Sequence, residues 1–174
     1  MTLSAQGEVR QLPVHADVCA IHHAMTGTTR NGCAAPAPVG PTRSLSPSAA
    51  APDAISGGGY YIHFEFASGD LTPDYQAHLT RLSQVLTEPG MAELCLKLVG
   101  HTDAVGSSRY NMKLSEDRAR TVRLFLVGAL GIDDERVLLG WEGERQLLPG
   151  IPAEDARNRR VEILAREGTS KSCL

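Results

Sequence analysis

The sequence predicts an α+β fold within the broad α/β class: a two-layer sandwich with two main helices on one face of a mixed four-stranded sheet. Two observations support this prediction. The apolar residues alternate between the periods of strands and helices in the order β-α-β-α-β-(turn)-β. All eight aromatic residues (four Tyr, three Phe and one Trp) lie at position 60 or later, so the large side chains for a core are concentrated in that part of the 174-residue chain.

The first strand and the first helix are expected within residues 60–90. Residues 60–66 alternate aromatic and β-branched side chains with polar ones, which is typical of a strand. Thr72 and Pro73 then provide an N-cap and a first-turn proline. An apolar stripe at helical spacing follows, made of Tyr75, Leu79, Leu82 and Leu86, and the helix is expected to end at Pro89 and Gly90.

The remaining elements continue the alternation. Residues 93–99 read as the second strand, ending at Gly100. Ser115 is a suitable N-cap for the second helix, which leaves residues 101–114 as a loop and places the helix end at Gly131. Two further short strands are expected at residues 136–141 and 160–165, with one helical turn between them at residues 153–158.

The first third of the chain has a different composition. Residues 1–59 contain no aromatic residue and six of the ten prolines, so they lack the large side chains that offset the entropy of ordering. We expect residues 1–59 to be a disordered or linker arm rich in Ala, Pro, Ser and Gly, residues 60–166 to form the domain, and residues 167–174 to be a flexible tail.

The overall charge and hydropathy disfavour several classes of protein. With 17 Lys and Arg against 20 Asp and Glu, the chain lacks the cationic excess of a nucleic-acid binder. The sequence contains no run of 18 apolar residues, so no transmembrane span is expected, and the first 30 residues show no export signal. Cys19, His22 and His23 read as part of the polar arm rather than as a metal site, so neither a metal nor a cofactor is expected.

The four cysteines form no CxxC pair. Three of them lie in the expected arm and tail. Cys95 lies between two leucines in the expected second strand, which favours a small buried apolar side chain over a reactive thiol.

The densest polar cluster lies between residues 100 and 119. Asp103 and Arg118 are a carboxylate and a guanidinium on opposite sides of one expected loop, and folding of that loop can bring them together. A carboxylate can bind an ammonium group, while the planar fork of arginine can bind a carboxylate through two hydrogen bonds. This pair of charges therefore predicts a binding site for a zwitterion.

Blocks of residues around this cluster resemble the OmpA-like carboxy-terminal domains that bind peptidoglycan. The blocks occur in the family order and together span about residues 60–166: Gly100-His101-Thr102-Asp103, Tyr110-Asn111, Leu114-Ser115, Arg118-Ala119, Gly131-Ile132, Arg136-Val137, Gly143-Glu144 and Asn158-Arg159-Arg160-Val161-Glu162-Ile163. The resemblance implies that Asp103 holds the ammonium group, and Arg118 the carboxylate, of the diaminopimelate stem residue of peptidoglycan.

Further contacts are expected around this pair. Thr102 and Asn111 are short polar residues that could bind the stem peptide or brace the loop, and Phe66 is expected against the aliphatic chain of the ligand. The resemblance also implies Arg160 near the site, although the sequence leaves open whether Arg159 or Arg160 faces it. Residues 144–157 depart from the family pattern, so the outer contacts of the ligand are open.

These features predict a non-enzymatic module that binds peptidoglycan non-covalently and anchors an envelope component, at the outer membrane or in the periplasm. A homodimer is left open. The alternatives are a structural, stator-type partner domain without ligand binding, and a cell-wall peptide hydrolase that uses Cys95 or His101.

Overall fold

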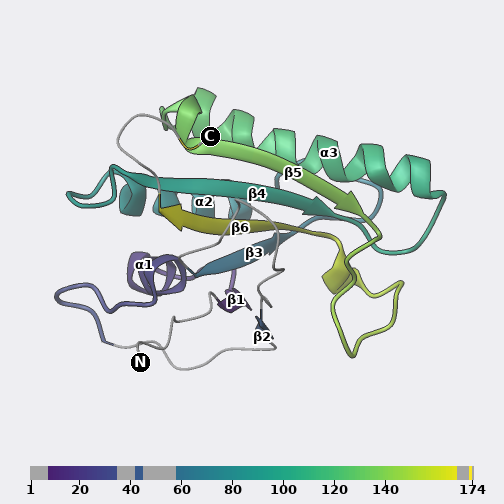
Figure 1. The fold of residues 1–174 in the computed structure, drawn as a ribbon, viewed down its shortest axis with the longest axis horizontal. Helices are drawn as coiled ribbons and strands as arrows, with labels where there is room; N and C mark the ends of the chain where they lie inside the picture. Colours follow the sequence, from purple (N-terminus) through teal and green to yellow (C-terminus); the bar gives the residue numbers. More distant parts are fainter. Residues whose placement is uncertain (1–7, 35–41, 45–57, 168–172, 174) are drawn as a thin grey trace.

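The computed structural model describes residues 8–34, 42–44, 58–167 and 173. Helices cover one face of a twisted mixed sheet, as the sequence predicts (Figure 1). The strand order is β2-β1-β3-β6-β4-β5. The strands are β1 (Glu8–Gln11), β2 (Thr42–Ser44), β3 (Gly59–His63), β4 (Leu94–His101), β5 (Val137–Gly143) and β6 (Arg160–Glu167). The helical elements are α1 (Val18–Thr26), α2 (Pro73–Leu86), α3 (Ser108–Leu124), η1 (Phe125–Ala129), η2 (Asp134–Arg136) and η3 (Ala156–Asn158).

The four strands expected from the sequence form the continuous unit β3-β6-β4-β5. β6 pairs antiparallel with both β3 and β4, while β4 and β5 are parallel. The main core lies between this sheet and α2 and α3, because alternate strand residues face the helices. Its fully buried members include Tyr60, Leu79, Leu98, Val122 and Ile163.

α3 begins earlier than predicted, which corrects the boundary placed at Ser115. Ser107 is the actual N-cap, since its side chain accepts a hydrogen bond from the N–H of Tyr110. Ser115 lies inside the helix, where its hydroxyl donates to the carbonyl of Met112 and accepts from the N–H of Gly143. The polar residues after Ser107 resemble a loop in composition but form the first two turns of α3.

The N-terminal segment also differs from the expected arm over its described residues. β1 adds to the edge of β3 in parallel, β2 pairs with β1, and α1 contacts α2. Val9, Ile21 and Met25 are buried, so aliphatic side chains and strand pairing supply the ordering that aromatics would have supplied. Most of the Ala, Pro, Ser and Gly stretch before position 58 lies outside the described residues.

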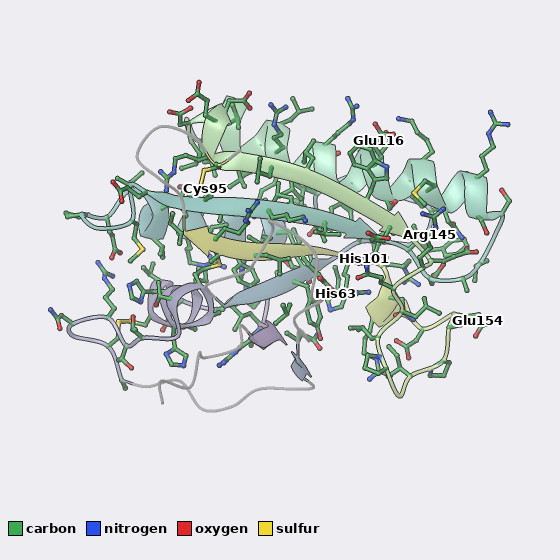
Figure 2. The ribbon with its side chains drawn as sticks, viewed as in Figure 1. His63, Cys95, His101, Glu116, Arg145 and Glu154 are labelled. Atoms are coloured by element: carbon green, nitrogen blue, oxygen red, sulfur yellow. A yellow bond between two sulfur atoms is a disulfide. The ribbon has the colours of Figure 1, made fainter. Side chains whose placement is uncertain are left out.

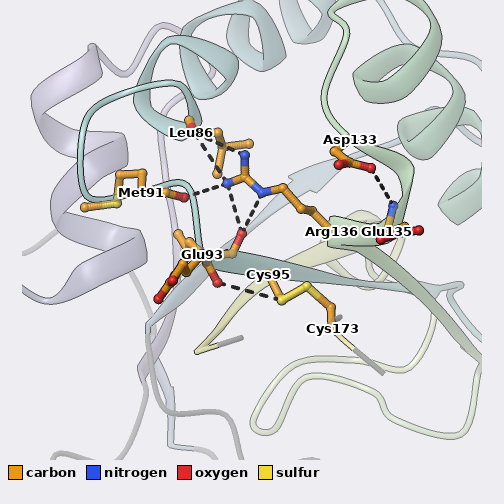
Figure 3. Close-up of a disulfide and its surroundings, with 9 residues drawn as sticks. Leu86, Met91, Glu93, Cys95, Asp133, Glu135, Arg136 and Cys173 are labelled. Atoms are coloured by element: carbon orange, nitrogen blue, oxygen red, sulfur yellow. Dashed lines mark hydrogen bonds between the residues drawn. A yellow bond between two sulfur atoms is a disulfide. The ribbon is translucent and has the colours of Figure 1, made fainter. Parts of the chain in front are cut away.

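Two disulfides join the cysteines of the chain. Cys19 in α1 is bonded to Cys33, and Cys95 near the start of β4 is bonded to Cys173 (Figure 3). Cys95 is buried as expected, but it is not the free apolar residue that its leucine neighbours suggested. Its partner is 78 positions away, a separation at which sequence spacing reveals no pairing. The expected tail is thus attached to the domain at Cys173; its other residues beyond 167 lie outside the described part of the chain.

Candidate functional site

The candidate site lies where β4 passes into α3. Gly100, near the end of β4, allows the two elements to come very close: a Cβ there would lie 1.9 Å from the carbonyl oxygen of Ser115. The loop between them contains Thr102 and Asp103, and α3 returns past it with Asn111 and Arg118. The close contact between strand and helix therefore sets the distance between the loop and the buried face of α3.

Arg118 is completely buried and held by three backbone carbonyl groups. Its Nε donates to Ser68 (2.9 Å), Nη1 to His101 (2.9 Å) and Nη2 to Glu65 (3.0 Å). The guanidinium also lies 5.4 Å from the ring centroid of Phe64. These contacts use three of its five N–H groups and fix the plane of the fork; the other two N–H groups have no acceptor among the described contacts.

The charge of Arg118 is retained despite its burial. Desolvation lowers the pKa of Arg118 to about 10, and the neighbouring Arg159 adds to this effect, while the charge of Asp103 opposes it. The guanidinium therefore remains positive at neutral pH. Because Arg118 bonds to the carbonyl of His101, two residues before Asp103, the two predicted members of the clamp lie in the same region of the structure.

Asp103 is 4% exposed and both of its carboxylate oxygens have partners. Oδ1 accepts the N–H of Val105 (3.3 Å), which closes a short turn, and Oδ2 accepts from Nη1 of Arg159 (3.1 Å). Among the described contacts, the salt-bridge partner of Asp103 is thus Arg159 rather than Arg118.

Thr102 and Asn111 lie beside Asp103, as expected. The side-chain amide of Asn111 donates to the carbonyl of Asp103 (3.3 Å) and to Glu144, so it braces the loop. The backbone of Thr102 bonds to Gly143 (2.9 Å), while its buried hydroxyl has no hydrogen-bond partner among the described residues. That hydroxyl therefore has unused hydrogen-bonding capacity in the described structure.

Glu144 contributes to the site although the sequence did not single out its role. Its carboxylate accepts hydrogen bonds from Ser108 and Asn111, which hold its pKa below the ordinary value. It thereby links the end of β5 to the first turn of α3. The segment after it also meets the site loop, because the N–H of Ala104 donates to the carbonyl of Ala153 (3.0 Å).

Among the described contacts, Arg160 bonds to Glu162 and Gln146, and the arginine that bonds to Asp103 is Arg159. Alternate residues of a strand point to opposite faces, and Arg160 shares the helix-free face with Glu162. It is fully buried there and donates to Glu162 Oε1 (2.6 Å) and to the carbonyl of Gln146 (3.1 Å). Burial alone would raise the pKa of Glu162, but hydrogen bonding and charge from His101 and Arg160 lower it to about 2.

Arg159 is the arginine that reaches the site. Its Nη1 binds Asp103, its Nε donates to the carbonyl of Phe64 (3.2 Å), and its guanidinium lies 5.8 Å from the ring centroid of Phe66. Phe66 is 61% exposed, which suits the predicted role as an apolar contact for a ligand. The sequence pointed to the pair Arg159 and Arg160, but only the strand register shows that Arg159 is the one that reaches the site.

The structure removes one of the two residues, Cys95 and His101, that the hydrolase alternative considered. Cys95 is in a disulfide, so it offers no thiolate nucleophile. Cys95 and His101 also lie towards opposite ends of β4 (Figure 2). Within the described residues, no group of three or more His, Cys, Asp and Glu side chains could hold a metal ion. None of the described helices is both long and apolar enough to cross a membrane.

Comparison with known proteins identifies relatives of the folded region. The outer membrane protein A of Bordetella avium is 39% identical over 104 residues, which cover 58% of this chain and 51% of that protein. The peptidoglycan-associated lipoprotein of Pseudomonas aeruginosa is 35% identical over 104 residues, covering 59% of this chain and 60% of that one. The chain thus spans about half to three fifths of the length of these two relatives.

Solved structures show the same fold. The peptidoglycan-associated lipoprotein from Burkholderia pseudomallei aligns with a TM-score of 0.54 at 29% identity, covering 61% of this chain and 89% of that one. The OmpA-like domain of FopA1 from Francisella tularensis aligns with a TM-score of 0.55 at 23% identity, covering 63% of this chain and 72% of that one. The model of the OmpA family matches residues 63–160, more than half of the chain and the whole of the site from Phe64 to Arg159. The protein therefore belongs to the OmpA family.

Proposed function

We propose that this domain binds peptidoglycan non-covalently through the diaminopimelate stem residue and so anchors an envelope component to the cell wall. The observation that carries the proposal is the placement of Asp103 and Arg118, two buried groups of opposite charge, at the junction of β4 and α3. Diaminopimelate presents an ammonium and a carboxylate on one carbon, which matches this pair. The names of the Pseudomonas and Burkholderia relatives, both called peptidoglycan-associated, support peptidoglycan as the binding partner.

The rigidity of Arg118 favours binding over catalysis. Its fork is held by three carbonyl groups, so a ligand carboxylate would meet a preorganised donor and little side-chain entropy would be lost. At Asp103 the described residues place a hydrogen-bonded carboxylate and two arginines, which is an arrangement suited to binding charged groups. The proposed activity is therefore adhesion to the wall.

An envelope location follows from the same proposal. Two disulfides are typical of proteins that fold in an oxidising compartment such as the periplasm. We therefore place the domain in the periplasm, against the wall and associated with the outer membrane.

Co-sedimentation with purified peptidoglycan sacculi tests the proposal. Wild type should sediment, whereas Asp103→Asn, which keeps the size of the side chain but removes its charge, should remain mostly soluble. Asp117→Asn is the matched control, because Asp117 lies on the exposed side of α3. Wild type that stays in the supernatant would contradict the proposal and support the stator-type alternative, in which the fold persists without ligand binding.

A further inference from the structure

Arg159 is the solvent-facing member of the charged group around Asp103. Its side chain is 17% exposed, against 5% for that of Asp103, while Arg118 is completely buried. Its guanidinium lies between the Asp103 carboxylate and the exposed ring of Phe66. A ligand that approaches Asp103 from solvent therefore meets Arg159 first.

The group of Asp103, Arg118 and Arg159 carries two positive charges and one negative charge. Two guanidinium groups, those of Arg118 and Arg159, lie around the single carboxylate of Asp103, and the repulsion between them contributes to the lowered pKa of Arg118. Oδ1 of Asp103 is engaged by the N–H of Val105, and Oδ2 by Arg159. The Oδ2 oxygen, which the turn leaves for a cation, is thus bonded to a cation of the protein itself.

We infer that Arg159 is a latch: it occupies the ammonium position on Asp103 in the free protein and is displaced when a ligand cation binds. This inference rests on the proposed function of the site. An ammonium can replace the guanidinium because both donate hydrogen bonds to the same carboxylate and carry the same charge. A neutral group cannot, since it would leave Asp103 buried without a positive partner on Oδ2.

The surroundings of Arg159 suit a side chain that changes partner. The contact with Phe66 is a cation–π contact at a mostly exposed ring, and the bond from Nε to the carbonyl of Phe64 is 3.2 Å long. Arg118, with three shorter backbone bonds and no exposure, is by contrast fixed. The ligand therefore exchanges Arg159 for its own ammonium while Arg118 stays in place for the carboxylate.

Titration calorimetry on the full chain with meso-diaminopimelate tests the latch. Arg159→Met, which keeps much of the length but has no charge, should bind about three- to tenfold more tightly than wild type. Arg159→Lys should stay within about twofold of wild type, because it keeps a competing cation. Arg157→Met is the matched control, since Arg157 pairs with Asp155 close by along the chain and should leave the affinity unchanged.

Pimelate has the two carboxylates of diaminopimelate but no ammonium. Its binding therefore shows whether Arg159 competes with the ligand ammonium or only blocks access to the site. The latch predicts no gain in pimelate affinity for Arg159→Met. An equal gain for both ligands would overturn it, because the arginine would then only obstruct access. Weaker binding of meso-diaminopimelate by Arg159→Met would also overturn it and make Arg159 a direct ligand contact. Failure of wild type and of every variant to bind meso-diaminopimelate or sacculi would instead overturn the proposed function, and the latch with it.

Discussion

At the scale of single residues, the candidate site depends on a buried arginine, Arg118, which donates to three backbone carbonyls and, in our proposal, also to a ligand carboxylate. Arg118 fixes three backbone carbonyls that belong to the segment after β3 and to the end of β4. Lysine cannot reproduce this pattern, because its ammonium is a point charge without the planar fork. The residue that we propose as the carboxylate ligand is therefore also a structural joint between neighbouring segments.

Arg118→Lys should accordingly destabilise the protein as well as weaken binding. Loss of the bidentate fork and of at least one charged hydrogen bond to a buried carbonyl is expected to cost about 2–4 kcal/mol in the free energy of unfolding. Urea denaturation measures this. Arg120→Lys is the control, since Arg120 is an exposed partner of Glu116 and its exchange should change the stability by less than about 0.5 kcal/mol. Equal stability of the two variants would contradict the structural role of Arg118.

The choice between Arg159 and Arg160 shows where prediction from the sequence ends at this scale. Both residues follow Asn158, and both are arginines, so composition and motif do not separate them. The register of β6 against β3, in which Arg160 pairs with His63, directs Arg160 to the helix-free face. Strand register is a tertiary property, set by pairing with residues about 100 positions away, and the local pattern does not contain it.

At the scale of elements, the contact between β4 and α3 determines the position of the site. The sequence predicted both elements from their apolar periodicity, but it placed the start of α3 at Ser115 instead of Ser107. Polar side chains in the first two turns caused the error, because Asn111 faces the Asp103 loop and not an apolar core. A helix whose buried face is polar at a binding site violates the periodicity from which helices are recognised.

Gly100→Ala should disrupt this contact. The added Cβ would fall 1.9 Å from the carbonyl oxygen of Ser115, so β4 and α3 must separate and the packing around Arg118 must loosen. We expect a loss of at least about 2 kcal/mol in the free energy of unfolding. Gly128→Ala in η1 is the matched control, because a Cβ there meets no atom within 4 Å. Unfolding curves of the two variants that coincide with wild type would show that the contact is looser than described.

His78 on α2 makes the contact with the N-terminal segment sensitive to pH. Its Nδ1 lies 3.0 Å from the carbonyl of Val14, to which it donates. Burial lowers the pKa of His78 to about 4, although the hydrogen bond to Val14 opposes this and the charge of Arg81 assists it. The neutral form is therefore the one that the folded protein favours.

The stability contributed by neutral His78 is present in full above about pH 6.5 and is lost as the pH falls toward 4, because the unfolded chain takes up the proton first. The loss should reach roughly 2 kcal/mol. Thermal unfolding between pH 7.5 and 4.5 measures it, with His78→Gln as the comparison that lacks this titration. If the unfolding temperatures of wild type and His78→Gln changed equally with pH, His78 would not be the group whose protonation destabilises the protein.

At the scale of the whole molecule, the family core is extended by segments at both ends. The sequence predicted the core from residue 60 onward because its aromatics and its periodicity agree with each other. It did not predict β1 and α1, since their burial depends on Val9, Ile21 and Met25 fitting against a sheet and helix formed elsewhere in the chain. Nor could spacing reveal the two disulfides, which join segments brought together only by folding.

The disulfide between Cys95 and Cys173 should stabilise the fold without affecting the site. It closes a long loop, and its loss in Cys173→Ser is expected to cost about 2–4 kcal/mol. Cys95 lies near the start of β4, whereas the site follows its other end, roughly 20 Å away along a strand of this length. Urea denaturation should show the lost stability while sedimentation with sacculi is unchanged at neutral pH. Loss of sedimentation in the folded variant would show that the tail participates in binding.

Sedimentation of wild type and Asp103→Asn with purified sacculi tests directly whether the carboxylate of Asp103 holds the wall peptide. We expect wild type in the pellet, Asp103→Asn in the supernatant with an unchanged circular dichroism spectrum, and Asp117→Asn in the pellet like wild type. Recovery of folded Asp103→Asn in the pellet to the same extent as wild type would contradict the claim that the carboxylate of Asp103 holds the wall peptide.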